Sequence, residues 1–167
     1  MPTPWRNGQG VTRDIATVSG HDGGLLWQVS LAELTGDCDF SDYAGFDRVF
    51  TPVKGDLVAL SHGDGPFVPC PLLTPYLFDG GKRTRCRLGG QAGRAFNVVT
   101  DPAWHRADVQ VLRLAAGTRV PHGAVVHCCS GRLDTGEGSA GPGDSLLDGG
   151  ASAAEPSIVI LVRIGPA

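Results

Sequence analysis

Residues 25–34 read Leu-Leu-Trp-Gln-Val-Ser-Leu-Ala-Glu-Leu, and this stretch indicates the fold class most clearly. Within it, large apolar side chains alternate with smaller or polar ones: Trp27, Val29 and Leu31 against Gln28, Ser30 and Ala32. A period of two is typical of a half-buried β-strand, because successive side chains of a strand point to opposite faces. The stretch therefore predicts a strand that carries Ser30 on one face and Trp27 on the other.

Ten further short extended runs lie on both sides of this stretch. They are Val11–Val18, Val49–Val53, Leu57–Ser61, Tyr76–Phe78, Arg83–Leu88, Ala95–Thr100, Val109–Leu114, Val125–Cys129, Ser145–Leu147 and Ile158–Ile164. The chain contains 25 glycines and 12 prolines, which favour turns between these runs, whereas helical periodicity is hard to find. The pattern predicts an all-β sandwich or barrel, with at most a short helical turn within residues 37–46.

A weak internal repeat runs through the chain. Lys54-Gly-Asp-Leu is followed by Asp79-Gly-Gly, and Ser130-Gly-Arg-Leu is followed by Asp148-Gly-Gly. In both copies we expect a Gly turn between two strands and an Asp-Gly-Gly turn that closes a hairpin, with Gly supplying a positive φ. Internal duplication and a chance match in a Gly-rich chain explain the repeat equally well.

Composition and charge exclude several classes of partner. A net charge of −3 offers no basic face for nucleic acid, and no apolar run approaches the roughly 20 residues of a membrane span. The cysteines are odd in number and contain no Cys-x-x-Cys spacing: Cys38, Cys70, Cys86, Cys128 and Cys129. No signal peptide is recognisable after Met1, so we expect a cytoplasmic protein with reduced thiols.

Five short motifs occur in order along the first hundred residues. They are Trp-Arg-Asn-Gly-Gln-Gly-Val-Thr-Arg at 5–13, Trp-Gln-Val-Ser-Leu-Ala-Glu at 27–33, Phe-Ser-Asp-Tyr-Ala-Gly-Phe-Asp-Arg at 40–48, Phe-Asp-Gly at 78–80 and Phe-Asn-Val at 96–98. Together they resemble the HutD/Ves family. The resemblance implies a cupin-type double-stranded β-helix with two cupin-like halves, residues 1–104 and 105–167, in a single bicupin domain spanning 1–167. Gly141-Pro-Gly-Asp-Ser-Leu-Leu is similar to a turn-and-strand segment common in cupins.

The resemblance also implies a role in histidine degradation, through binding of a small carboxylate such as formiminoglutamate and limitation of flux. The chain departs from the family pattern at Gln9, Gln28 and Gly81, where Gly, Arg and Asp are usual. A lost positive charge at Gln28 would alter ligand preference if this side chain lies beside the pocket.

The candidate ligand-binding residues combine flexible backbone, guanidinium groups and polar side chains: Asn7, Thr12, Arg13, Ser30, Arg48, Asp79 and Asn97. Arginine can grip a carboxylate through a bidentate fork. An amide on a strand, as at Asn97, is expensive to bury unless it is hydrogen-bonded. The structural alternatives are plain turns at Asn7 and Asp79, solvated arginines, and a satisfied buried hydroxyl at Ser30.

Neither a metal, a cofactor nor a catalytic residue is predicted. The histidines show no His-x-His spacing of the kind that cupin metalloenzymes use: His21, His62, His105, His122 and His127. An unconventional site of His122 and His127 with the adjacent cysteines is the weaker alternative. A cupin enzyme, either an isomerase or a metal-dependent oxygenase, and a protein-interaction module are the competing hypotheses. Many cupins associate through sheet edges, which makes a homodimer the expected assembly if one forms.

Overall fold

The computed structural model describes residues 3–4, 10–56 and 58–167. Throughout these ranges the regular structure is β-strand and no residue is helical, which confirms the all-β prediction. A helix able to cross a membrane is accordingly not found in the described ranges. The helical turn predicted within residues 37–46 is wrong, because backbone N–H groups of this segment bond to distant strands and turns. Phe40 N donates to Thr84 O at 2.9 Å, and Tyr43 N donates to Gly80 O at 3.0 Å.

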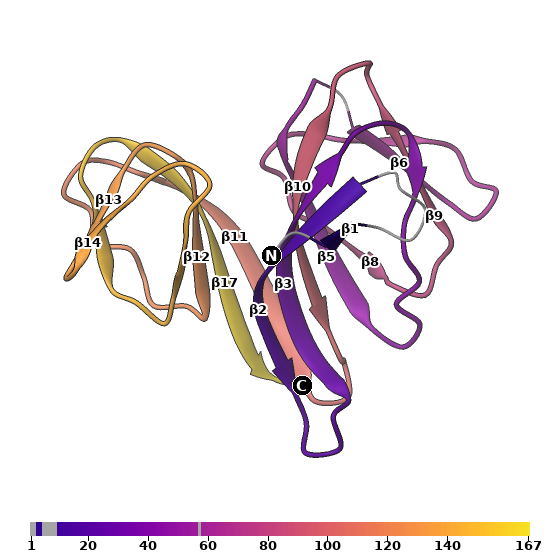
Figure 1. Ribbon diagram of the computed structural model, residues 1–167, viewed down its shortest axis with the longest axis horizontal. Coiled ribbons are helices and arrows are strands. Elements are labelled where there is room, and N and C mark those ends of the chain that lie inside the picture. The colour runs from indigo at the N-terminus through magenta and orange to yellow at the C-terminus, as the bar shows by residue number, and fades with distance from the viewer. Residues whose placement is uncertain (1–2, 5–9, 57) are drawn as a thin grey trace. The chain divides into compact units, whose positions relative to one another are not determined.

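The chain divides into two compact units, and unit 1 comprises Met1–His105 with Ala167. Its larger sheet is antiparallel with the order β1-β2-β3-β10-β5-β8 (Figure 1). These strands are β1 (Thr3–Pro4), β2 (Gly10–Ser19), β3 (Leu25–Leu34), β10 (Gly93–Thr100), β5 (Asp47–Lys54) and β8 (Tyr76–Asp79). A smaller sheet has the order β4-β9-β6-β7. Its strands are β4 (Cys38–Asp39), β9 (Thr84–Leu88), β6 (Val58–His62) and β7 (Val68–Cys70).

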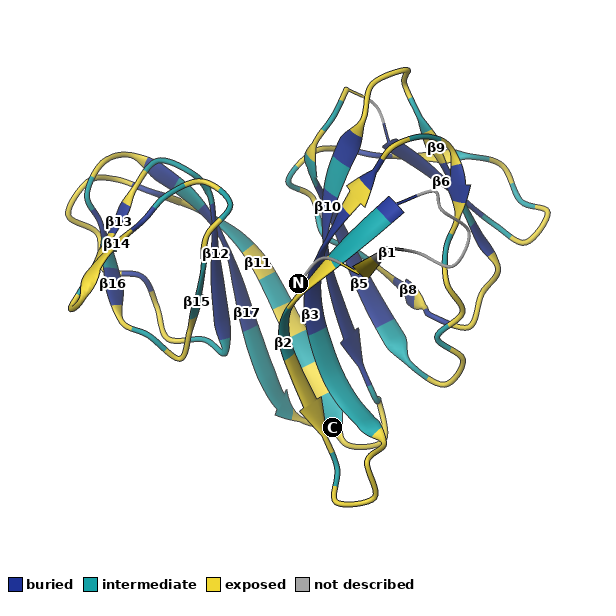
Figure 2. Cartoon of the chain, viewed as in Figure 1, coloured by how far each residue is buried: buried dark blue, intermediate teal, exposed yellow. Residues whose placement is uncertain are grey.

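The core of unit 1 is formed by apolar side chains from both sheets. Phe50 and Leu34 of the larger sheet lie in one buried cluster with Leu60 and Cys86 of the smaller sheet. Figure 2 shows that β10 and the middle of β3 are buried. The expectation of a half-buried β3 is wrong for residues 29–32, which are buried on both faces.

Unit 2 comprises Arg106–Pro166 and contains a four-stranded and a three-stranded sheet. The first has the order β11-β17-β12-β15, with β11 at His105–Leu114, β17 at Ser157–Pro166, β12 at Val125–Ser130 and β15 at Ser145–Leu147. The second has the order β14-β13-β16, with β14 at Gly138–Ala140, β13 at Leu133–Thr135 and β16 at Ala151–Ala153. Leu133, Val159 and Leu161 lie at the centre of its core.

The two units repeat one order of strand pairing. In unit 1, β10-β5-β8 and β9-β6-β7 are neighbours, and in unit 2 the corresponding series are β17-β12-β15 and β16-β13-β14. The repeated sequence segments occupy equivalent turns: Gly55 and Gly131 have the predicted positive φ of 120° and 83°. The repeated pairing supports internal duplication, which stays a prediction.

The Asp-Gly-Gly turns differ from expectation in two respects. They connect strands of different sheets, β8 to β9 and β15 to β16, and so do not close hairpins. Their glycines do not supply a positive φ; in the second turn Asp148 itself has a φ of 47°. Aspartate can adopt this positive φ because its short polar side chain tolerates the left-handed αL conformation.

All eleven runs predicted as extended coincide with strands of the described chain. The six strands that were not predicted are two or three residues long: β1, β4, β7, β13, β14 and β16. Segments of this length carry too few alternations to show a period of two.

Candidate functional site

The register of the larger sheet in unit 1 brings polar side chains onto one face. Residues directly opposite each other in an antiparallel pair point to the same side. Ser30 lies opposite Asn97, Thr12 opposite Ala32, and Arg48 opposite Val99. A cavity of about 40 Å³ opens on this face, and its lining among the described residues is Thr12, Ser30, Ala32, Ser41, Tyr43, Arg48, Asn97 and Val99.

Arg48 is the main charged group of this cavity, and it is 6% exposed. Its guanidinium lies over the Phe40 ring, 4.4 Å from the ring centroid. Burial lowers the pKa of Arg48 to about 10, since desolvation disfavours the charged form. Within the part of the chain that the structure describes, no carboxylate forms an ion pair with Arg48.

Asn97 holds the guanidinium in place. Arg48 Nε and Nη2 donate to Asn97 Oδ1 at 3.2 and 2.9 Å, and Asn97 Nδ2 donates to Ala95 O at 3.3 Å. These bonds use two of the five N–H groups of the guanidinium. The other three form no hydrogen bond with the described residues. The expectation that Asn97 must be bonded if buried is met, and its partner is the predicted Arg48.

Ser30 adds a second donor to the cavity. The side chain is 7% exposed, and its hydroxyl forms no hydrogen bond with any described residue. The Ser30 oxygen is open to the cavity, where water or a ligand can form a hydrogen bond with it. Thr12, which is half-buried, also lines the cavity. Ser30 and the free edge of Arg48 thus present donors to the same small space.

Sequence reasoning did not select Ser41 and Tyr43, which complete the lining. Both belong to the motif at residues 40–48, from which only Arg48 was chosen as a candidate. Their place in that motif is the sequence feature that could have indicated them. Tyr43 is fixed by backbone bonds on the far side of the turn: Gly80 N donates to Phe46 O at 2.7 Å while Tyr43 N donates to Gly80 O. A Cβ on Gly80 would lie 2.9 Å from Tyr43 O, which explains glycine here by close approach rather than by φ.

Two predicted site residues are not brought to the cavity, and a third, Asn7, lies outside the described residues. Arg13 is exposed on β2, because strand alternation turns it away from the face that carries Thr12. Asp79 is exposed and accepts a hydrogen bond from Gly81 N at 2.9 Å, so the turn itself accounts for its side chain.

Gln28 lies beside the cavity without lining it. The Tyr43 hydroxyl donates to Gln28 Oε1 at 3.3 Å, and Gln28 Nε2 donates to Asp14 Oδ1 at 3.1 Å. The side chain shares its strand face with Ser30 and Ala32, as predicted. A change at this position therefore reaches the cavity through Tyr43.

Unit 2 has no equivalent of the Arg48–Asn97 pair. Each unit has a bulge two residues before its equivalent glycine, at Val53 before Gly55 and at Cys129 before Gly131, and this aligns Arg48 with Ala124. The same alignment places Leu161 where unit 1 has Asn97. Two apolar residues thus stand where unit 1 carries the bonded polar pair, and the candidate site is a property of unit 1.

The histidines are engaged separately. His62 Nδ1 lies 2.9 Å from Thr84 Oγ1, and His127 Nδ1 lies 2.9 Å from Ser145 Oγ. Across the described ranges, no three or more His, Cys, Asp or Glu side chains gather as ligands of one metal ion would. Glu33, the last residue of the 27–33 motif, is exposed and pairs with Arg94.

The architecture is that of the cupin class. A cupin 2 conserved barrel domain protein from Leptotrichia buccalis matches 95% of this chain and 89% of its own with a TM-score of 0.63 at 9% identity, a likeness of fold alone. The chain belongs to the HutD family, whose model matches residues 1–155. The resemblance drawn from the motifs is therefore confirmed, as is the cupin-type fold.

Two relatives show how far the similarity extends. A HutD structure from Pseudomonas fluorescens SBW25 (formate condition) covers 100% of this chain and 94% of its own, with a TM-score of 0.82 and 21% identity. A 21.2 kDa Pseudomonas putida protein, named for the hutC 3′ region, is 34% identical over 108 residues. That alignment covers 64% of this chain and 57% of the relative, so it spans little more than half of the relative's length.

The substitution Asn97→Asp is expected to weaken carboxylate binding by about tenfold or more, because the new carboxylate supplies the counter-charge that Arg48 lacks. It would occupy the guanidinium and repel an anionic ligand. Calorimetric titration with formate measures the change. Gln110→Glu, which adds the same charge on an exposed strand of unit 2, is the matched control. Equal affinities of Asn97→Asp and the wild type would contradict the assignment.

Proposed function

We propose that the chain is a small-molecule-binding protein that takes a carboxylate at Arg48, and that this binding serves a regulatory role in histidine degradation. The observation that carries the proposal is the buried guanidinium without a counter-charge among the described residues. A buried charge is stable only when it is paired or well hydrogen-bonded, and here three N–H groups remain available. A carboxylate supplies both the charge and the acceptors.

The size of the cavity restricts what can enter it. A volume of about 40 Å³ accommodates a few water molecules, since one needs about 10–15 Å³. It therefore suits formate or the carboxylate end of a longer molecule. A ligand such as formiminoglutamate would place one carboxylate on Arg48 and Ser30, and its remaining atoms would extend beyond the cavity.

The relatives support this choice of ligand class. The Pseudomonas putida relative takes its name from the hutC region, and the Pseudomonas fluorescens HutD structure carries formate in its description. Formate and formiminoglutamate share the carboxylate that the Arg48 cavity would recognise. These likenesses favour histidine degradation as the setting, and formiminoglutamate as the larger ligand to examine first.

The test is a calorimetric titration of the full chain against formiminoglutamate, urocanate, histidine, glutamate and formate. We expect saturable binding, one site per chain, for at least one of the five. Absence of binding by all of them would remove the histidine-degradation proposal. Metal analysis of protein purified without chelators accompanies the titration: a stoichiometric transition metal would favour the metal-dependent enzyme instead.

Gln28→Arg is expected to tighten binding of dicarboxylates about threefold to tenfold, since a cation near the cavity contributes about 1 kcal/mol in partly solvated surroundings. Formate, which has a single carboxylate already held by Arg48, should gain less. The two affinities are compared by calorimetry in variant and wild type. An Arg at the exposed Gln110 serves as the charge control, and a gain equal to that control would argue against a location beside the cavity.

A further inference from the structure

A second group of reactive side chains lies in unit 1, outside the Arg48 cavity. Cys38 on β4 and Cys86 on β9 are directly opposite each other in an antiparallel pair. Two residues along, Phe40 N donates to Thr84 O, and the alternation of antiparallel pairs makes the cysteines a hydrogen-bonded pair as well. Such pairs have Cα atoms about 5.5 Å apart, within the range of about 4.4–6.8 Å that disulfides bridge.

The two opposed thiols differ in the direction of their pKa shifts. The hydrogen bond from Cys86 lowers the pKa of Cys38, an effect that burial and the nearby Asp37 and Asp39 oppose. The same bond raises the pKa of Cys86. Cys38 is therefore the thiol that ionises first, and Cys86 is the one that retains its proton. Thiolates, not thiols, attack disulfides.

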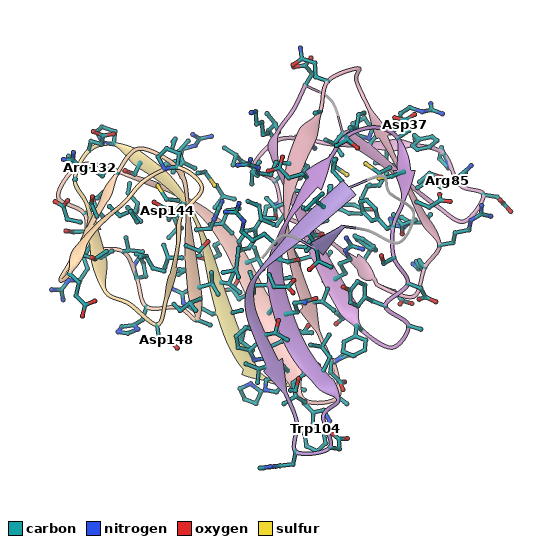
Figure 3. All side chains as sticks on the ribbon, viewed as in Figure 1. Asp37, Arg85, Trp104, Arg132, Asp144 and Asp148 are labelled. Atoms are coloured by element: carbon teal, nitrogen blue, oxygen red, sulfur yellow. The ribbon has the colours of Figure 1, made fainter. Side chains whose placement is uncertain are left out.

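A hollow of about 310 Å³ gives access to this pair. Its lining among the described residues is Asp37, Cys38, Asp39, Phe67, Arg85, Cys86 and Arg87. Asp37 and Arg85 are labelled in Figure 3 and belong to this hollow. The Arg87 guanidinium lies 4.0 Å from the Phe67 ring centroid, so a cation and an aromatic surface stand beside the two carboxylates. Charges of both signs around a thiol pair suit a small charged disulfide of peptide type.

The other cysteines lack this combination. Cys70 is as buried as Cys38 and Cys86, but unlike them it does not line the hollow. Burial raises the pKa of Cys128, and it raises that of Cys129 to about 12. Neither of these two lines the hollow.

We propose that Cys38 and Cys86 form a reversible dithiol–disulfide site whose oxidant is a low-molecular-mass disulfide carrying both carboxylate and ammonium groups. The Cys38 thiolate attacks one sulfur of that disulfide, the S–S bond breaks, and one small thiolate leaves and takes up a proton. Cys86 then loses its proton and attacks the Cys38 sulfur of the mixed disulfide. The Cys38–Cys86 bond forms and the second small thiol departs, so two protein thiols are oxidised while one disulfide is reduced to two thiols.

The experiment uses the full wild-type chain and glutathione disulfide as the probe. Native protein is equilibrated with the probe, free thiols are counted by alkylation, and the blocked chain is mapped by non-reducing peptide analysis. Arg85 and Arg87 flank Cys86, so chymotrypsin replaces trypsin for the digest. We expect two of the five thiols to disappear, a chain lighter by two hydrogens, a Cys38–Cys86 crosslink, and recovery of both thiols with dithiothreitol.

Variants separate this reaction from others. Cys86→Ser is expected to retain one glutathione on Cys38, since the attacking second thiol is gone, whereas Cys129→Ser should form the crosslink as the wild type does. The proposal would be overturned if all five thiols of the native chain stayed reduced in glutathione disulfide. A crosslink through Cys70, Cys128 or Cys129 would overturn it as well. The wild-type map decides the matter even if a variant fails to fold.

Discussion

Replacing Arg48 by Met is expected to abolish carboxylate binding while leaving the protein folded. Loss of the charged partner of a buried hydrogen-bonded pair removes about 2–5 kcal/mol, which corresponds to at least about 30-fold in affinity. The ligand would also meet an apolar side chain in place of the three N–H groups that form no hydrogen bond with the described residues. Calorimetric titration with the tightest ligand of the five measures the loss.

The same substitution should raise the free energy of unfolding by about 0–2 kcal/mol, because it removes a desolvation penalty and leaves Asn97 Oδ1 without its donors. Burial lowers the pKa of Arg48 to about 10, which corresponds to about 3 kcal/mol of unfavourable desolvation that Met removes. Against this, Asn97 Oδ1 loses its donors at a cost of about 1–3 kcal/mol. The contact with the Phe40 ring is kept by the thioether, which packs well on aromatic rings. Urea denaturation followed by circular dichroism measures the difference.

Arg13→Met is the matched control, because it removes the same group from an exposed position on β2. Its affinity should stay within about twofold of the wild type, as is usual for a solvated charge outside a site. If Arg48→Met bound the ligand as tightly as Arg13→Met, the cavity would not be the binding site. If Arg48→Met unfolded, Asn97→Asp would still test the cavity.

The second large effect is expected at Gly80, where Gly80→Ala should reduce both stability and binding. The added Cβ would lie 2.9 Å from three atoms of the adjoining segment: Phe46 O, Tyr43 Cβ and Tyr43 O. Two of these are backbone atoms, so the segment must move. Overpacking of this kind costs about 1–3 kcal/mol, and movement of Tyr43 opens the cavity wall. Urea denaturation and formate titration of one preparation measure both losses.

Gly36→Ala provides the control, since nothing lies within 4 Å of a Cβ at that position and its φ is not positive. Its stability should equal or slightly exceed that of the wild type, because alanine restricts the unfolded chain. A Gly80→Ala variant as stable as Gly36→Ala would show that the Tyr43 segment is not held closely against the turn. Normal stability with lost binding would place the effect in the cavity wall alone.

The strands were predictable because alternation is a local property. Leu25–Leu34 and Ser145–Leu147 have the predicted bounds, and the other predicted runs differ from the strands mainly at their ends. The short strands, such as β4 and β7, could not be found this way. They exist because distant partners are available to them, and that information is absent from a window of two or three residues.

The site was predictable in its residue types and only partly in its geometry. Thr12 and Arg13 are neighbours on a strand, so their side chains must point to opposite faces. One of the two could therefore have been rejected from the sequence. Which strands pair is not a local property: Arg48 and Asn97 are 49 residues apart and meet only because β5 and β10 are neighbours. The close approach of Gly80 to Tyr43 could not be predicted either, because it depends on a turn that folds back over another segment.

The most direct test of the carboxylate site is the Nε–H resonance of Arg48 during a titration with formate, followed by NMR and assigned from its absence in Arg48→Met. This N–H is buried and donates to Asn97, which gives it slow exchange and a distinct signal. The cavity assignment predicts a saturable shift of the Arg48 signal, with the signal of exposed Arg13 unchanged. A fixed Arg48 signal at formate concentrations that shift only exposed arginines would contradict it.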